Sequence, residues 1–218
     1  MPSTSARAAA GSKEGLIGGF WTLERTARCL SRRSRLSKPL PALLFFTDPQ
    51  RTPDPERIAE RLPRGAGIVF RPFGAPDAAA QGRRLAAIAR RRGLVLLAGA
   101  DPKLARRIGA AGVHLPERLA PRASALRRAR PGWIVTAAAH SLPAARRALA
   151  AGADAVVLSP AFPSRSPSAG RPLGPMRLSV WVRAGARPAY GLGGVSERTA
   201  KRLLGTGLVG LAAVEALA

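Results

Sequence analysis

Short apolar runs alternate with longer amphipathic stretches along the chain from residue 39 onward. The apolar runs are rich in Val, Leu, Ile, Phe and Ala and lack the alternating polar positions of a half-exposed strand. Continuous runs of this kind predict strands that are buried on both faces, as in a parallel sheet covered by helices. The predicted strands span residues 40–46, 67–71, 94–98, 112–115, 133–137, 155–159, 188–192 and 209–213.

The stretches between these runs have helical periodicity and are rich in Ala, Arg and Leu. Asp77, Ser141 and Ser196 are predicted N-caps, because their side chains can accept a hydrogen bond from a free backbone N–H. Glycine follows three of the stretches, where a left-handed residue commonly ends a helix. The predicted helices span residues 54–62, 77–92, 102–110, 122–130, 141–151, 174–184 and 196–204.

Repeated strand–helix units of this length predict an α/β protein with a (β/α)8 TIM barrel fold. An open doubly wound sheet is the alternative, but eight short units at regular spacing favour closure. The chain ends soon after the last predicted strand. The eighth helix is therefore expected to be missing or vestigial.

Residues 1–38 differ in composition from the barrel domain that we predict over residues 39–218. The segment is rich in Ser, Gly and Arg and carries eight basic residues against Glu14 and Glu24. We expect a basic, disordered N-terminal extension. An Arg-rich start that is poor in acids also resembles a transit peptide, and a misassigned start codon would give the same pattern.

The chain of 218 residues has 36 basic and 12 acidic residues and a formal net charge of +24. All but four of the basic residues are arginine. This excess could mark a nucleic-acid surface or reflect a compositional bias that places Arg at solvated positions. Arg pairs recur in four of the seven predicted helix regions and are not interleaved with aromatic residues, which are 5% of the chain. We therefore favour bias and do not expect nucleic acid as a partner.

Cysteine and histidine are scarce, since Cys29, His114 and His140 are the whole set. A disulfide framework and a Cys/His zinc site are thereby excluded. No apolar run approaches the ~20 residues that a membrane helix needs. The sequence predicts a soluble, cytoplasmic protein without membrane contacts, and it leaves the oligomeric state open.

Active sites of such barrels lie in the loops that follow the strands. The turn Gly191–Ser196 follows the seventh strand, and the backbone N–H groups of Gly193 and Gly194 are candidates for binding a phosphate. The same glycines could serve only to make a tight turn. Hydroxyl and guanidinium groups follow the sixth strand, at Ser164, Arg165 and Ser166. Arg71 ends the second strand and is a candidate anion ligand, with a plain salt bridge as the alternative.

Four stretches together resemble the thiamine phosphate synthase/TenI family. The string GAAGVHL at 109–115 is similar to the family's GADGVHL, and AHSL at 139–142 precedes a GAD triplet as in that family. SPAFPSRS at 159–166, followed by PLG, is similar to its phosphate loop, and GLGGV at 191–195 matches its glycine turn. In this order and spacing the stretches cover most of residues 39–218.

The resemblance implies a barrel that joins a pyrimidine methyl diphosphate to a thiazole phosphate, with loss of pyrophosphate and help from Mg²⁺. Several family positions differ here. Of the family's Gln, Arg and Lys after the second strand only Arg71 remains, and its Ser after the eighth strand aligns with Glu215. None of the family's metal-binding acids aligns with an acid, so Mg²⁺ is a doubtful cofactor. Asp101 and Glu117 could replace those ligands only if both loops shift register.

Two other functions remain open. The TenI branch tautomerises a carboxythiazole phosphate, and the resemblance gives His140 the role of general acid/base in that reaction, since imidazole titrates near neutral pH. A histidine held by hydrogen bonds at the rim is the structural alternative for His140. His114 lies in a buried strand and is expected to be structural. A non-catalytic barrel that binds a phosphate ligand or RNA is the third hypothesis.

Overall fold

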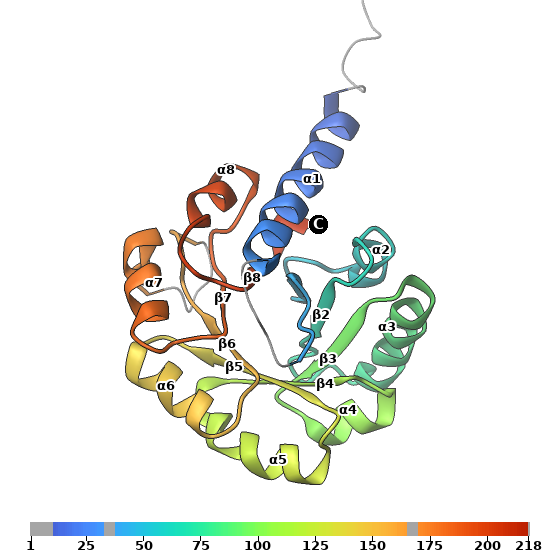
Figure 1. Ribbon diagram of the computed structural model, residues 1–218. Coiled ribbons are helices and arrows are strands. Elements are labelled where there is room, and N and C mark those ends of the chain that lie inside the picture. Colours follow the sequence, from blue (N-terminus) through green and yellow to red (C-terminus); the bar gives the residue numbers. More distant parts are fainter. Residues whose placement is uncertain (1–10, 33–37, 165–169, 218) are drawn as a thin grey trace, which may run out of the picture.

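The computed structural model describes residues 11–32, 38–164 and 170–217, with side chains from residue 22 onward. Eight parallel strands form a closed barrel in which each strand pairs with the next along the chain and β8 pairs with β1 (Figure 1). Helices surround the barrel on the outside. This arrangement confirms the predicted (β/α)8 class and excludes the open doubly wound sheet.

Each strand overlaps one of the predicted apolar runs. Strand β5 extends two residues beyond its predicted end, and β1 begins three residues later than predicted. The strands are β1 (Leu43–Phe46), β2 (Gly67–Phe70), β3 (Val95–Gly99), β4 (Gly112–Leu115), β5 (Ile134–Ala139), β6 (Ala155–Leu158), β7 (Ala189–Gly191) and β8 (Gly210–Ala213).

The seven predicted helices are present, although each is at least one residue shorter than predicted and the last is split into α8 and a 3₁₀ turn. Ser141 caps its helix by accepting a hydrogen bond from the Ala144 amide, whereas Asp77 occupies an N-cap position without a capping bond. The α-helices are α2 (Pro55–Ala59), α3 (Ala78–Arg92), α4 (Pro102–Ile108), α5 (Ala123–Ala129), α6 (Leu142–Ala150), α7 (Gly174–Arg183) and α8 (Glu197–Ala200). The 3₁₀ turns are η1 (Glu117–Arg122), η2 (Lys201–Leu203) and η3 (Glu215–Leu217).

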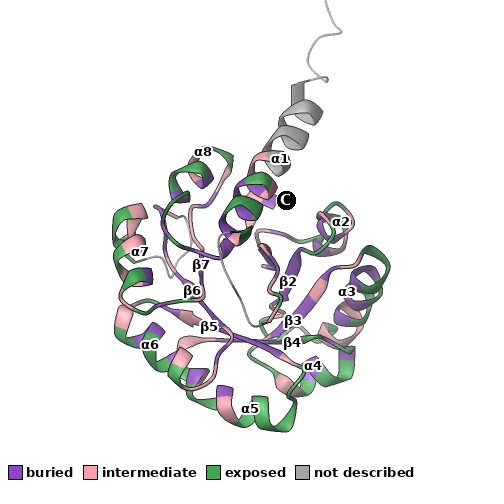
Figure 2. Cartoon of the chain, viewed as in Figure 1, coloured by how far each residue is buried: buried purple, intermediate pink, exposed green. Residues whose placement is uncertain are grey.

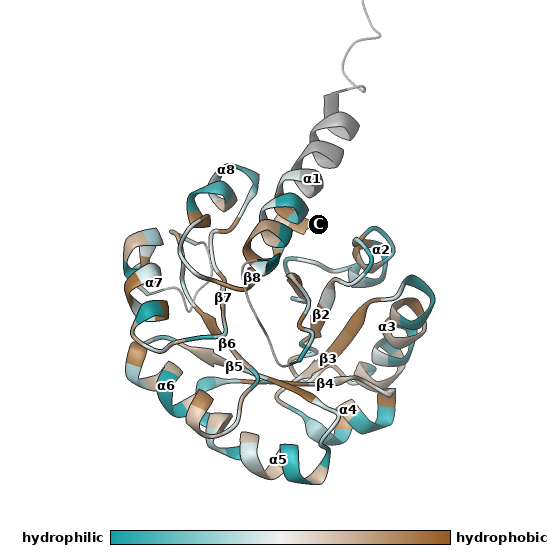
Figure 3. Ribbon diagram, viewed as in Figure 1, coloured by the Kyte–Doolittle hydropathy of each residue, from teal (hydrophilic) through white to brown (hydrophobic). Residues whose placement is uncertain are grey.

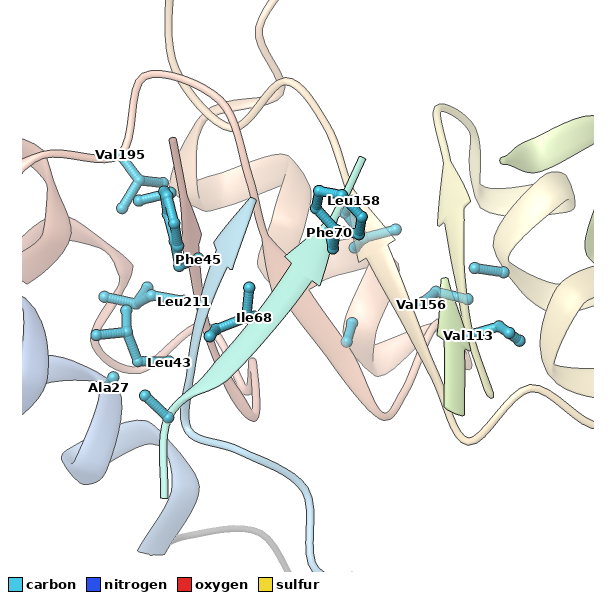
Figure 4. Packing of buried hydrophobic residues seen from close by; sticks show 14 of the residues in the cluster. Ala27, Leu43, Phe45, Ile68, Phe70, Val113, Val156, Leu158, Val195 and Leu211 are labelled. Atoms are coloured by element: carbon cyan, nitrogen blue, oxygen red, sulfur yellow. The ribbon is translucent and has the colours of Figure 1, made fainter. Parts of the chain in front are cut away.

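The buried side chains form two layers because successive residues of a strand point to opposite faces. In β1, Leu44 and Phe46 belong to the cluster that fills the barrel, whereas Leu43 and Phe45 pack in the layer between strands and helices (Figure 4). Buried residues follow the strands and the inner faces of the helices (Figure 2). This double layer explains why the strands are apolar throughout.

Helix α1 (Gly11–Arg32) contradicts the expectation that the whole N-terminal extension is disordered. Leu23, Ala27 and Leu30 are buried, and the helix packs against β1, β8 and α8 (Figures 1 and 4). Residues spaced by three and four positions share one helix face, so these three give α1 an apolar stripe. The sequence analysis passed over this stripe because the Ser, Gly and Arg content of residues 1–38 indicated disorder. Residues 1–10 and 33–37 of the extension lie outside the described residues.

The place of a helix after β8 is occupied by α1. In the described part of the chain only the turn η3 follows β8, as the sequence predicted for a missing or vestigial eighth helix. Helix α1 lies between α8 and α2 around the barrel (Figure 1). The N-terminal segment therefore covers the junction of β8 and β1, which would otherwise expose apolar side chains.

The outer faces of the helices are largely hydrophilic (Figure 3). Arg83, Arg84, Arg106, Arg146 and Arg147 are all exposed. This placement is what a compositional bias toward Arg at solvated positions predicts. Within the described residues, no helix has the length and apolar character needed to cross a membrane.

Candidate active site

A cavity of about 810 Å³ opens at the carboxyl ends of the strands. The loops after all eight strands contribute to its wall. A smaller pocket of about 320 Å³ is built from the loops after β1, β6, β7 and β8. The two hollows share Arg51, Ser164, Leu192, Gly193 and Val214, so they are parts of one candidate site.

Arg71 is the first residue after β2 and lines the larger cavity. Its amide donates a hydrogen bond to Oγ1 of Thr47 and its Nε donates one to the Thr47 carbonyl, both at 2.8 Å. The guanidinium lies between the rings of Phe46 and Phe73, about 5 Å from each ring centre (5.3 and 5.2 Å). Burial lowers the pKa of Arg71 to about 10, against the opposing effect of Asp48. The site therefore holds a partly desolvated cation.

Nη2 of Arg71 is buried without a hydrogen-bond acceptor in the described part of the chain. The nearest carboxylate oxygen is Oδ2 of Asp48, at 3.7 Å. A buried guanidinium N–H without an acceptor is costly, and an anionic ligand is one group that would supply it. The role of Arg71 as an anion ligand stays a prediction, and Nη2 is the atom that would donate to such an anion.

Two loop residues at the cavity wall have a left-handed backbone conformation, which residues other than glycine seldom adopt. Phe73 has φ +48° and Ala100 has φ +62°. Such residues cost of order 1–3 kcal/mol and cluster at functional sites. Phe73 is also exposed despite its size, at 67% of its surface, and covers Arg71 from the solvent side.

His140 and Glu117 form a pair at the edge of the cavity. Nδ1 of His140 lies 2.8 Å from Oε2 of Glu117, and the His140 amide donates to the same oxygen at 2.8 Å. Burial alone would raise the pKa of Glu117, but the hydrogen bonds from His140 outweigh it and lower that pKa. An ionised carboxylate only accepts hydrogen bonds, so Nδ1 carries the proton and Nε2 of the neutral ring is left as the basic atom.

His114 is buried on β4, as the sequence predicted. Its Nδ1 lies 3.0 Å from Oγ1 of Thr136, and its ring packs edge-on against Phe46 with 4.9 Å between ring centres. Burial, with a further effect of Arg71, lowers the pKa of His114 to about 3. The side chain is therefore neutral at physiological pH and supports the floor of the cavity.

Gly193 and Gly194 lie where the loops after β6 and β7 meet. A Cβ on Gly194 would lie 2.3 Å from the carbonyl oxygen of Pro163, and one on Gly193 would lie 3.0 Å from Pro160. Both glycines have positive φ, of 93° and 61°. Gly193 and Gly194 are therefore needed for the tight turn. Among the described residues the Gly194 and Val195 amides donate no hydrogen bond, which leaves them for a ligand in the smaller pocket.

The loop after β6 carried three predicted ligands, of which the structure describes one. Ser164 lines both hollows beside Gly193. Arg165 and Ser166 lie outside the described residues. The structure therefore brings Ser164, Gly193 and Gly194 together and places Arg71 and His140 at the wall of the larger cavity.

A model of the thiamine monophosphate synthase family matches residues 43–217. The chain belongs to this family. The thiamine-phosphate synthase of Methylococcus capsulatus is 36% identical over 161 residues, which are 70% of each chain. The bifunctional thiamine biosynthesis protein ThiM/ThiE of Symbiobacterium thermophilum is 33% identical over 59% of this chain and 27% of its own. The match to a relative from Aquifex aeolicus spans 57% of that relative's length.

A solved structure of the same family has the same fold. The thiamine phosphate pyrophosphorylase from Pyrococcus furiosus superimposes with a TM-score of 0.67 at 25% identity, over 79% of this chain and 84% of the other. The resemblance found in the four sequence stretches is thereby confirmed.

The family resemblance implied Mg²⁺, and the carboxylates of this chain do not fit that ion. Asp101 caps α4 by accepting hydrogen bonds from the Lys103 and Leu104 amides. Glu117 accepts from His140, and Asp48 accepts from Arg51. Across the described ranges, no group of three or more His, Cys, Asp or Glu side chains is placed to share a metal ion. Asp101 and Glu117, the two alternative ligands, are thus each engaged by groups of the protein.

Sequence reasoning missed two features of this family member's site. Arg51 lines both hollows. It lies five residues after the first strand and belongs to none of the recognised motifs. Glu117 was considered only as a possible metal ligand, whereas it binds His140. The signal for Arg51 was its position in a loop that follows a strand, where barrel active sites lie.

Proposed function

We propose that this protein is an enzyme of thiamine biosynthesis that acts on a phosphorylated thiazole bound in the cavity. Family membership supports the substrate class. The geometry best supports a proton transfer on that thiazole, of the kind that tautomerises a carboxythiazole phosphate into its aromatic form. The observation that carries the proposal is the His140–Glu117 pair at the cavity wall.

The substrate's phosphate belongs at the smaller pocket in this proposal. Ser164 supplies a hydroxyl there, and the Gly194 and Val195 amides supply N–H groups at the start of the turn into α8. Backbone amides and hydroxyls are effective partners for phosphate oxygens. The thiazole ring then extends into the larger cavity, whose wall contains His140 and Arg71.

His140 moves the proton. With Nδ1–H held by Glu117, Nε2 removes a proton from one carbon of the non-aromatic substrate and returns it at another. The bonding electrons shift around the ring, which becomes aromatic, and no leaving group departs. Arg71 provides positive charge for the substrate's carboxylate and for the negative charge that develops after proton removal.

The direct test is to incubate the purified protein with the non-aromatic carboxythiazole phosphate and follow the aromatic product by its ultraviolet absorption. We expect catalysed conversion by the wild type, and loss of activity in His140→Ala with substrate binding retained. Arg90→Ala, on the exposed end of α3, is the matched control. Equal rates with His140→Ala and the wild type would contradict the proposal.

The second candidate is the synthase reaction, in which the thiazole phosphate joins a pyrimidine methyl diphosphate with loss of pyrophosphate. The names of the relatives favour it. The same preparation is incubated with both synthase substrates and Mg²⁺ and analysed for thiamine phosphate. Formation of thiamine phosphate at an enzymatic rate would replace the tautomerase proposal with the synthase one.

A further inference from the structure

Arg51 lies in the loop after β1, at the boundary of the two hollows that form the candidate site. The phosphate-binding side of the site consists of Ser164, Gly193 and Gly194. Among the described residues, Arg51 is the basic residue that lines the smaller pocket with them. No motif of the family pointed to this residue in the sequence.

The loop that carries Arg51 is fixed by hydrogen bonds to Asp48. Oδ1 of Asp48 accepts from the amides of Gln50 and Arg51, at 3.1 and 3.2 Å. Thr52 closes the loop, because its Oγ1 accepts from the Asp48 amide at 2.8 Å and its amide donates to the Asp48 carbonyl at 2.7 Å. The backbone of Arg51 is therefore held in place before any ligand binds.

Hydrogen bonds orient the guanidinium of Arg51 but do not use all of its N–H donors. Nε and Nη2 donate to Oδ2 of Asp48 at 3.1 and 2.8 Å. A guanidinium has five N–H donors, so three remain after these two bonds. Nη1 lies 4.0 Å from Oε1 of Glu215, beyond hydrogen-bond distance. Asp48 thus holds one edge of the guanidinium and leaves the other available.

Glu215 creates the need for this cation. It lines the smaller pocket, at a position where the resemblance places a serine that contacts the phosphate. A carboxylate beside a phosphate is repulsive, and two like charges close together disfavour both ionised forms. Nη1 of Arg51 lies 4.0 Å from Oε1 of Glu215. Its charge offsets the repulsion that Glu215 would otherwise impose.

We propose that Arg51 binds the substrate's phosphate, and that the Arg51–Glu215 pair takes over the role of the family's serine. The proposal rests on the proposed function for the identity of the ligand, a phosphorylated thiazole. Nη1 and the free N–H of Nη2 donate to phosphate oxygens, while the amides of the glycine turn bind the opposite side. Asp48 is a positioning residue that keeps the guanidinium facing the pocket.

The test measures binding by calorimetry for three probes: thiazole phosphate, the corresponding thiazole alcohol and inorganic phosphate. Arg51→Gln is expected to weaken thiazole phosphate about tenfold to a hundredfold, the range for loss of a charge-assisted hydrogen bond, and to leave the alcohol unchanged. Arg51→Lys keeps the positive charge but not the planar guanidinium. It is expected to lose less affinity for thiazole phosphate than Arg51→Gln. Arg90→Gln is the surface control.

The double variant separates the two roles of Arg51. Glu215→Ser alone should bind thiazole phosphate at least as tightly as the wild type. Arg51→Gln with Glu215→Ser should recover much of the affinity lost in Arg51→Gln, because the carboxylate that repels the phosphate is gone. No recovery, or an equal loss for alcohol and phosphate, would overturn the proposal. Circular dichroism of each variant shows whether the barrel is intact.

Failure of this inference differs from failure of the proposed function. If the wild type binds inorganic phosphate and Arg51→Gln weakens it, while thiazole phosphate binds no better than phosphate, the role of Arg51 stands and the thiazole assignment is wrong. If thiazole phosphate binds equally to the wild type and Arg51→Gln, the role of Arg51 is wrong and the thiazole assignment stands. A wild type that binds neither probe contradicts both.

Discussion

Oε2 of Glu117 accepts two hydrogen bonds from one residue, the backbone amide and the Nδ1–H of His140, each at 2.8 Å. The two residues are 23 positions apart and come from the loops after β4 and β5, which are adjacent strands of the barrel. Closure of the barrel thus aligns a carboxylate with an imidazole at the cavity wall. This pair is the chemical centre of the proposed reaction.

Replacing Glu117 with Gln should lower the turnover of carboxythiazole phosphate by about tenfold to a hundredfold, a modest part of what general acid–base catalysis contributes. The amide has no charge to stabilise a protonated His140, and it no longer fixes Nε2 as the basic atom. Substrate affinity, measured by calorimetry, should change little. Glu60→Gln, which breaks a surface pair with Arg91, is the control. An unchanged turnover in Glu117→Gln would remove Glu117 from the mechanism.

His114 should make the protein less stable as the pH falls. Its pKa is about 3 in the folded chain and near 6.5 when unfolded, so the unfolded state binds a proton first. The contribution of His114 to the free energy of unfolding is full above pH 6.5 and is lost progressively toward pH 3. The loss is roughly 3 kcal/mol between pH 6.5 and 4. Urea unfolding across this range measures the slope.

His114→Asn is the matched variant, since its amide group lies near the position of Nδ1 beside Thr136. We expect this variant to be less stable than the wild type at pH 7. Its free energy of unfolding should fall less steeply as the pH is lowered. The same pH slope in both proteins would show that other groups cause the acid sensitivity.

Helix α1 should contribute to the stability of the barrel although it lies in the basic N-terminal segment. Leu23→Ala removes a fully buried side chain at the junction with the barrel and should cost about 2–4 kcal/mol in the free energy of unfolding. Arg25→Ala, on the exposed face of α1, should change it by less than about 0.5 kcal/mol. Equal effects of the two substitutions would mean that α1 does not pack on the barrel in solution.

Gly194 should tolerate no side chain, because it combines a positive φ with a close approach to Pro163. Gly65 also has a positive φ, of 83°, but has open space around its Cβ direction. Gly65→Ala should therefore cost about 1 kcal/mol of stability, and Gly194→Ala should cost more and weaken phosphate binding. The comparison uses thermal unfolding and calorimetry. If the two alanine variants behave alike, the contact with Pro163 is not important.

The barrel could be predicted because its strands are continuous apolar runs, a pattern that depends on local sequence alone. Helix α1 was missed although Leu23, Ala27 and Leu30 have helical spacing, because the Ser, Gly and Arg content of residues 1–38 indicated disorder. Arg71, His140 and the glycine turn could be identified as candidates from their positions after predicted strands and from short motifs. The roles of Arg51 and Glu117 depend on partners that only barrel closure brings near, so the sequence offered their positions but not their contacts.

The most direct test of the proposed function is the rate at which purified wild type and His140→Ala convert the non-aromatic carboxythiazole phosphate to its aromatic tautomer. We predict enzymatic conversion by the wild type at neutral pH and a loss of about a hundredfold or more in His140→Ala, with similar substrate affinity. Conversion by the wild type no faster than the uncatalysed reaction would contradict it.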